Sequence, residues 1–179
     1  MGEMARTTEH QLLLGEWACL GILYPGPLHG FAIAARLKPA GDIGRVWSLS
    51  RALTYRALDQ LTARGYIEPI ADEPGTAGGN RTILAATRSG RAQLRQWLAT
   101  PVAHLRDLRS ELLLKLIVAE LCGIDVTEML AAQRAHIADM AQAIHAQVAE
   151  HPGDVVALWR SESSDAALRF LDRLPTSIG

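Results

Sequence analysis

A short run of polar and basic residues has the chemistry needed to contact duplex DNA. Arginine can donate two parallel hydrogen bonds to guanine, serine and threonine can bond bases or phosphates, and tyrosine commonly holds a phosphate. The run supplies Ser50, Arg51, Thr54, Tyr55 and Arg56. On a helix these side chains would lie largely off the apolar stripe, near the N-terminal half, which is the part that enters a major groove. The segment therefore predicts a helix that reads DNA.

The elements around this run must hold it in place. The helix is expected to begin near Ser48 or Ser50, either of which can cap it, and to end at Gly65. Leucine and alanine recur on one side of it at helical spacing. The predicted buried stripe consists of Leu49, Leu53, Ala57, Leu58 and Leu61.

A strand, a glycine-containing loop and a second strand follow this helix. We expect the strands over residues 66–71, where Pro69 implies an edge position, and over residues 81–86. The order helix, strand, loop, strand predicts a winged helix-turn-helix. The wing tip would contain Gly75, Gly78 and Gly79, and its stem would present Asn80, Arg81 and Thr82 to DNA. Composition leaves one alternative open, a solvated helix face beside an ordinary hairpin.

The rest of the chain is predicted to be helical. The front half contains helices over residues 10–23, over 28–37 with Phe31, Ala34 and Leu37 buried, and over 88–98 with Thr87 as cap. A bend at Thr100 and Pro101 would separate residues 1–100 from residues 101–179. In the back half we expect helices over residues 106–121 and 127–149, and a last helix capped by Asp154. The fold class is mostly α with a small β-hairpin, a winged helix plus a C-terminal antiparallel helical dimerisation domain.

The distribution of charge agrees with this division. The chain has 179 residues, 49% of them hydrophobic, and a net charge of −1. Residues 1–100 hold 11 basic and 8 acidic side chains, residues 101–179 hold 7 and 11, and residues 45–95 hold eight arginines against four acids. A basic front half joined to an acidic back half suits a nucleic-acid reader attached to a domain that avoids phosphates.

Other patterns exclude competing classes. The N-terminus has no secretion signal, and the longest apolar run, 112–121, is far shorter than the roughly 20 residues of a membrane span, so we expect a cytoplasmic protein without membrane contact. Cys19 and Cys122 predict buried thiols rather than a disulfide or a zinc site. The histidines lack metal-ligand spacing, and no G-x-S-x-G elbow occurs. We therefore predict neither an enzyme nor a cofactor.

The tryptophans permit two interpretations. Trp17, Trp97 and Trp159 lie on apolar helix faces, which predicts packing in the core or at a dimer contact. The alternative is a small, flat effector molecule that stacks between them. Trp47, beside Ser48, would anchor the start of the reading helix.

Several segments together resemble the PadR family of transcriptional regulators. They are PGPLHGFAIAARL, SLSRALTYRALDQLTARGYIEP and RTILAATRSGRAQLRQWL, and HLRDLRSELLLKL resembles the start of the longer C-terminal helical domain found in part of that family. The combination of Leu53, Tyr55 and Leu58 with Gly65 and the T-x-x-G from Thr87 to Gly90 is the most specific part. Leu84 and Ala86 depart from the family's larger residues in the return strand.

The resemblance implies a dimeric winged-helix regulator, usually a repressor, that dimerises through its C-terminal helices. By position it assigns DNA contacts to Ser48, Ser50, Arg51, Thr54 and Tyr55 on the helix and to Arg81 in the wing. We therefore predict a homodimer that binds an inverted-repeat operator in double-stranded DNA and is released by a small aromatic or apolar effector. The alternative is a winged-helix module that binds a protein and not a specific DNA site.

Overall fold

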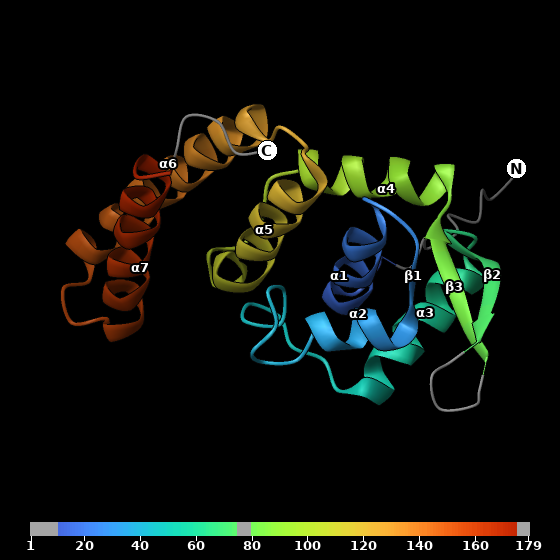
Figure 1. The fold of residues 1–179 in the computed structure, drawn as a ribbon. Coiled ribbons are helices and arrows are strands. Elements are labelled where there is room, and N and C mark those ends of the chain that lie inside the picture. The colour runs from blue at the N-terminus through green and yellow to red at the C-terminus, as the bar shows by residue number, and fades with distance from the viewer. Residues whose placement is uncertain (1–10, 75–79, 175–179) are drawn as a thin grey trace, which may run out of the picture.

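A small three-stranded sheet and a set of helices make up the computed structural model, which describes residues 11–74 and 80–174 (Figure 1). The front half contains α1 (Leu14–Leu23), β1 (Leu28–His29), α2 (Gly30–Arg36), α3 (Arg51–Ala63), β2 (Ile67–Pro74), β3 (Asn80–Ala86) and α4 (Arg88–Ala99). The back half contains a 3-10 turn η1 (Leu105–Asp107), a π-helical turn η2 (Leu108–Leu112), α5 (Leu113–Cys122), α6 (Thr127–Glu150) and α7 (Val155–Asp172). The predicted fold class, a winged helix followed by a helical region, is confirmed.

The sheet is antiparallel with the strand order β1-β3-β2. Ile67 pairs with Ala86 and Pro74 with Asn80, so β2 and β3 form the hairpin of the wing. β2 is an edge strand, as Pro69 predicted, because proline cannot donate a hydrogen bond to a second neighbour. The predicted strand bounds were too short for β2, which continues to Pro74.

The expectation of a helix from Leu28 is wrong at its first two residues. Leu28 and His29 are extended and pair with Leu84 and Ile83 of β3. The helix begins only at Gly30, where the ring nitrogen Nδ1 of His29 accepts a hydrogen bond from the backbone N–H of Ala32 at 3.1 Å. The third strand of the sheet thus comes from a segment that apolar periodicity alone assigned to a helix.

α1 occupies the centre of the molecule, and its residues from Gly15 to Leu23 are all buried. It packs against α3 and α4 on the side of the winged helix and against α5 on the other side. Gly21 permits the closest approach to α5, because a Cβ atom there would lie 2.6 Å from Cγ1 of Val118. One apolar core therefore continues from the front half into the back half of the chain.

Side-chain caps set two helix starts that the sequence predicted. The Thr87 hydroxyl accepts from the N–H of Gly90 at 3.1 Å and also donates to the carbonyl of Gly65 at 2.7 Å. Gly90 itself lies against the backbone, because a Cβ there would be 2.1 Å from the carbonyl oxygen of Tyr66. Asp154 caps α7 by accepting from Val156 and Ala157. The T-x-x-G motif therefore joins the sheet to α4.

The segment over residues 106–121 is not the single α-helix that its apolar composition predicted. It consists of η1, then η2, and only then α5. Leu108 and Leu112, the first and last residues of the π turn, are both buried and lie four residues apart on its inner side. A sequence that is apolar almost all round contains too little contrast to show such a change in winding.

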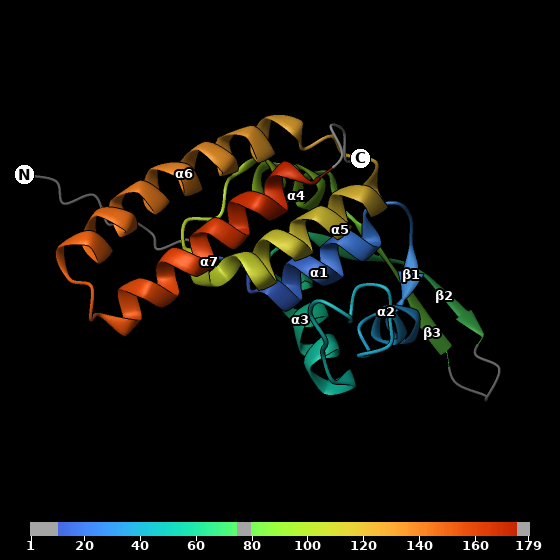
Figure 2. The same ribbon diagram turned by 90° about the vertical axis from the view of Figure 1, so that its left-hand side faces the viewer.

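α6 and α7 form a long antiparallel pair at the end of the molecule opposite the wing (Figures 1 and 2). An ion pair joins Arg134 to Asp172 at 2.6 Å, and Nε2 of His145 lies 3.1 Å from a carboxylate oxygen of Asp165. The buried amide of Gln133 accepts from the N–H of Val102 at 2.6 Å and donates to its carbonyl at 3.0 Å. These two hydrogen bonds attach α6 to the strand-like connection that follows α4.

Candidate nucleic-acid interface

The N-terminal end of α3 is set by Ser50. Its hydroxyl oxygen accepts from the N–H of Leu53 at 3.2 Å, which confirms the predicted cap. Ser48 and Ser50 are both exposed. Trp47 is half-buried and packs against the core, as its predicted anchoring role requires. The approach to α3 is therefore fixed while its first polar side chains remain in solvent.

On α3, the buried and exposed positions near the N-terminus are shifted by one residue from the prediction. Thr54 was expected on the outer face and is fully buried, whereas Leu53 was expected in the buried stripe and is 50% exposed. The buried residues Thr54, Ala57, Leu58 and Leu61 follow helical spacing, and the Thr54 hydroxyl donates to the carbonyl of Ser50 at 3.0 Å. This hydrogen bond satisfies the Thr54 hydroxyl, so the residue can be buried in the core without a large cost. A buried Thr54 side chain cannot reach a base.

Arginine, tyrosine and small or apolar side chains make up the exposed N-terminal part of α3. Arg51 and Arg56 have no carboxylate partner in the described residues, and no acidic residue occurs between Ser48 and Arg56. Ala52 and Leu53 are also exposed there, and sequence reasoning did not include them. If Thr54 and not Leu53 is taken as the first buried residue of α3, helical spacing places both Ala52 and Leu53 on the outer face.

The first turn of α2 contributes to the same surface. Phe31, which was expected in the core, is 52% exposed, and the Arg51 guanidinium carbon lies 5.6 Å from its ring centroid. The same carbon lies 5.8 Å from the centroid of Tyr55. Ile33, Ala34 and Leu37 fill the core positions of this segment instead. Arg51 thus has an aromatic ring from each of two helices as its partners.

The wing stem contains acidic as well as polar and basic residues. Asn80 and Thr82 are exposed and Arg81 is partly buried. The ladder sets Asp72 opposite Thr82 and Glu73 opposite Arg81, and the Thr82 hydroxyl donates to Asp72 at 2.9 Å. The predicted glycine tip lies outside the described residues. The N-terminal end of α3 points to the same side of the molecule as the C-terminal end of β2 and the N-terminal end of β3. This side faces away from α4 (Figures 1 and 2).

Two of the three singled-out tryptophans belong to the core. Trp17 and Trp97 stack on each other at 4.9 Å and 7°, and each is 6% exposed, so no molecule fits between them. The Lys115 ammonium lies 5.1 Å from the Trp97 ring centroid and 3.2 Å from a carboxylate oxygen of Glu111, which also accepts from the Trp97 indole N–H at 3.3 Å. Burial lowers the pKa of Lys115, and Glu111 opposes that shift.

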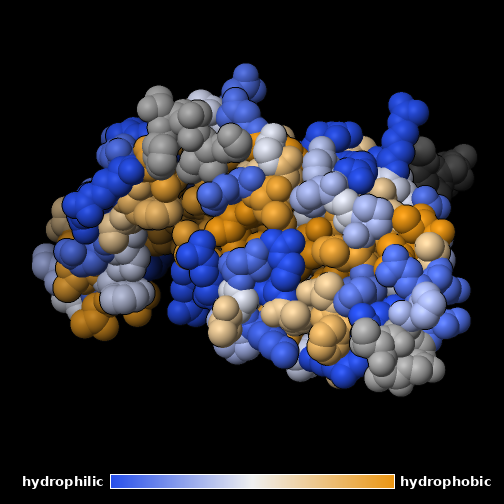
Figure 3. Space-filling model, viewed as in Figure 1, coloured by the Kyte–Doolittle hydropathy of each residue, from blue (hydrophilic) through white to orange (hydrophobic). Residues whose placement is uncertain are grey.

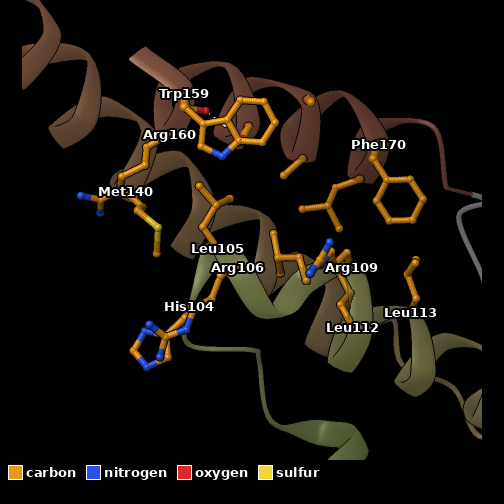
Figure 4. A pocket seen from close by; sticks show the side chains of 15 residues that line it. His104, Leu105, Arg106, Arg109, Leu112, Leu113, Met140, Trp159, Arg160 and Phe170 are labelled. Atoms are coloured by element: carbon orange, nitrogen blue, oxygen red, sulfur yellow. Dashed lines mark hydrogen bonds between the residues drawn. The ribbon is translucent and has the colours of Figure 1, made fainter. Parts of the chain in front are cut away.

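Trp159 lies elsewhere, on a groove between α7 and the segment that contains η1 and η2. The groove has a volume of about 1020 Å³. Trp159 and Phe170 on α7 lie across it from Leu105 and Leu112, and Arg106, Arg109 and Arg160 lie among them (Figure 4). Apolar surface gathers beside the hollow between the α6–α7 pair and the rest of the molecule (Figure 3). Sequence reasoning named only Trp159 of these residues as a site candidate.

Other kinds of site find no support in the described part of the chain. No group of three or more His, Cys, Asp or Glu side chains there could hold a metal ion. Burial raises the pKa of the Cys19 and Cys122 thiols to about 12, so both stay protonated and unreactive near neutral pH. No described helix is both long and apolar enough to cross a membrane.

The helices, the sheet and the wing hairpin define the winged helix-turn-helix class. Residues 19–96 match the family model of the transcriptional regulator PadR-like family. This match confirms the resemblance to that family drawn from the sequence.

Matches among solved structures include two of Bacillus subtilis PadR. The one in complex with operator DNA is 18% identical with a TM-score of 0.47, over 88% of this chain and 94% of that chain. The one without DNA is 18% identical with a TM-score of 0.42, over 89% and 91%. A third, smu.1604c from Streptococcus mutans UA159, is 14% identical with a TM-score of 0.45, over 89% and 97%. No curated protein matches the chain.

Proposed function

We propose that this PadR-like regulator binds a specific DNA site through α3 and represses transcription. The observation that supports this most is the exposed, acid-free N-terminal half of α3, on which Arg51 and Arg56 have no carboxylate partner in the described residues. An unpaired guanidinium on an exposed helix end retains the donors that a guanine or a phosphate would accept.

The residues that we assign to DNA follow from this placement. Ser48, Ser50, Arg51, Tyr55 and Arg56 are exposed at or near the start of α3 and are proposed to contact bases and phosphates. Asn80, Arg81 and Thr82 of the wing are proposed to contact the backbone beside the groove, although Asp72 and Glu73 reduce the positive charge there. Thr54 is removed from the predicted set because it is buried.

We also propose that the chain acts as a homodimer through its back half. Of the ten large apolar side chains that are exposed in the described residues, five lie on α7: Val155, Val156, Leu158, Trp159 and Phe170. A surface of this kind on one helix marks a contact with a partner. Two copies would place two α3 helices on an inverted repeat, with half-sites about one turn of DNA, roughly 10 bp, or a multiple apart.

Release by an effector is the last part of the proposal. A small aromatic or apolar molecule would enter the groove beside Trp159 and favour a dimer in which the two α3 helices have the wrong spacing. The test is whether such molecules displace the operator from the unaltered dimer and fail to do so when Leu105, which lines the groove outside α7, is replaced by Ala.

DNA binding is tested by recovering DNA fragments from the source genome on the full chain and measuring their affinity at several salt concentrations. Phosphate contacts make the affinity fall steeply with salt. Arg51→Ala should lower specific affinity about five- to 150-fold, which corresponds to about 1–3 kcal/mol for an arginine on guanine. Arg169→Ala, on exposed α7, is the matched control. Absent or salt-independent binding would favour the protein-interaction module instead.

A further inference from the structure

Phe31 is an exposed aromatic residue with no role in the core. It lies in the first turn of α2, and 52% of its surface is exposed although the apolar pattern of α2 predicts burial. A single exposed apolar side chain is common in proteins. What distinguishes Phe31 is its partner, because the Arg51 guanidinium of α3 lies over its ring at 5.6 Å.

Within the described residues, Arg51 contacts two aromatic rings and no carboxylate. It occupies the first turn of α3, where the partial positive charge of the helix N-terminus disfavours a cation. Its only partners in the described residues are the rings of Phe31 and, at 5.8 Å, Tyr55. Rings stack against the flat face of a guanidinium and leave its N–H edge free. The N–H groups on that edge are the donors that acceptor atoms of a base would bind.

The neighbouring glycine fixes the second ring. A Cβ atom on Gly30 would lie 2.9 Å from Cε1 of Tyr55 and 3.2 Å from its hydroxyl oxygen. Tyr55 therefore packs directly on the backbone at the start of α2. Gly30 and Phe31 are adjacent in the sequence. Tyr55 packs on Gly30, and Phe31 supplies the other ring that contacts Arg51.

We propose that Phe31 is a positioning residue for base recognition: together with Tyr55 it orients the Arg51 guanidinium and so sets the preference for guanine at the position that Arg51 meets. The two acceptors of guanine, O6 and N7, lie in the plane of the base, so a bidentate contact needs a guanidinium of fixed orientation. This inference rests on the proposed DNA-binding function and names a residue that acts within it.

The test compares two substitutions on the full chain, with the operator recovered from the genome. Phe31→Leu keeps an apolar side chain without a π face, and Phe31→Tyr keeps the ring. Affinity is measured for the operator with guanine, adenine or 7-deazaguanine, which lacks N7, at each position in turn. We expect Phe31→Leu to reduce the guanine-over-adenine ratio at one position by about two- to five-fold, as for a cation–π contact at an exposed site. Phe31→Tyr should keep that ratio and the sensitivity to 7-deazaguanine.

A structural role and a failed proposal give different results. Tyr24→Leu removes a ring that lies 4.9 Å from the guanidinium carbon of Arg91 on α4, and it should leave the ratio unchanged, even if it weakens both affinities equally. If Arg51→Ala abolishes the guanine preference while Phe31→Leu keeps it in full, the positioning role is overturned and the proposed function stands. If the unaltered chain shows no base preference at any position, the proposed function itself fails.

Discussion

At the residue scale, charge and burial conflict most clearly at Lys115. Its side chain is 1% exposed, and its ammonium donates to the carbonyl of Thr100 and pairs with Glu111 beneath the Trp17–Trp97 stack. A buried ammonium is costly unless such partners compensate for lost hydration. Desolvation is the largest influence on this group and lowers its pKa below the ordinary value of 10.5.

This shift predicts a pH-dependent stability. Between the folded pKa and 10.5 the unfolded chain binds more protons than the folded chain, so the contribution of Lys115 to the free energy of unfolding rises with pH in that window. Lys115→Met removes the titrating group and keeps the volume. Urea unfolding of both proteins should be measured from pH 7 to pH 10.5. The free energy of unfolding of the wild type should rise with pH relative to that of the variant. Parallel curves would contradict the prediction.

Single residues also show where sequence reasoning reached its limit. Ser50, Arg51, Tyr55 and Arg56 were correctly expected to be exposed on α3, but Thr54 was not. A leucine is more apolar than a threonine, so the pattern favoured burial of Leu53. The structure buries Thr54 because its hydroxyl bonds the Ser50 carbonyl, a local compensation that hydrophobicity does not record.

At the scale of elements, the start of α3 combines a structural and a binding role in one side chain. Ser50→Ala removes the cap and should destabilise the chain by about 1 kcal/mol. Ser50→Asp keeps the cap but places a negative charge where DNA is proposed to lie, so stability should be retained while operator affinity falls. Thermal unfolding and fluorescence anisotropy with labelled operator measure the two effects separately.

Ser50→Asn is the control, because it keeps a capping group without a charge. Its stability should stay close to that of the wild type, and its operator affinity should fall less than that of the Asp variant. Equal affinity of the Asp and Asn variants would place DNA away from this end of α3 and count against the proposed interface.

Elements differ in how far the sequence determined them. The bounds of α3, α4 and α6 and the start of α7 were predicted closely, because apolar periodicity is clear there and side chains cap three of these helices: Ser50, Thr87 and Asp154. β1 was missed because two residues are too few for a strand pattern, and they are extended only through pairing with β3. The π turn η2 was missed because its two buried leucines, Leu108 and Leu112, are four residues apart, a spacing that fits an α-helix equally well.

At the scale of the whole molecule, the exposed face of α7 is the feature that a single copy leaves unexplained. Trp159 is 73% exposed and lies on the groove with Phe170. Trp159→Asp should convert the proposed dimer into a monomer, because a carboxylate would be costly to bury against a second copy. Light scattering after size-exclusion chromatography measures the mass of each variant.

Glu162→Ala, on an exposed position of the same helix, is the control and should leave the mass unchanged. A wild-type chain that runs as a monomer, or a Trp159→Asp variant that remains a dimer, would argue against α7 as the contact. Either result would leave the assignment of α3 to DNA untouched.

The close packing of Gly21 on Val118 has a consequence for how a signal could cross the molecule. α1 is shared, since one side supports α3 and the other side rests on α5, and the core continues through both. One continuous core therefore spans the bend at Thr100 and Pro101 that the sequence predicts as a boundary. A tilt imposed on α5 would turn α1 and the winged helix with it, and a small angle at α5 would become a larger displacement at the N-terminal end of α3.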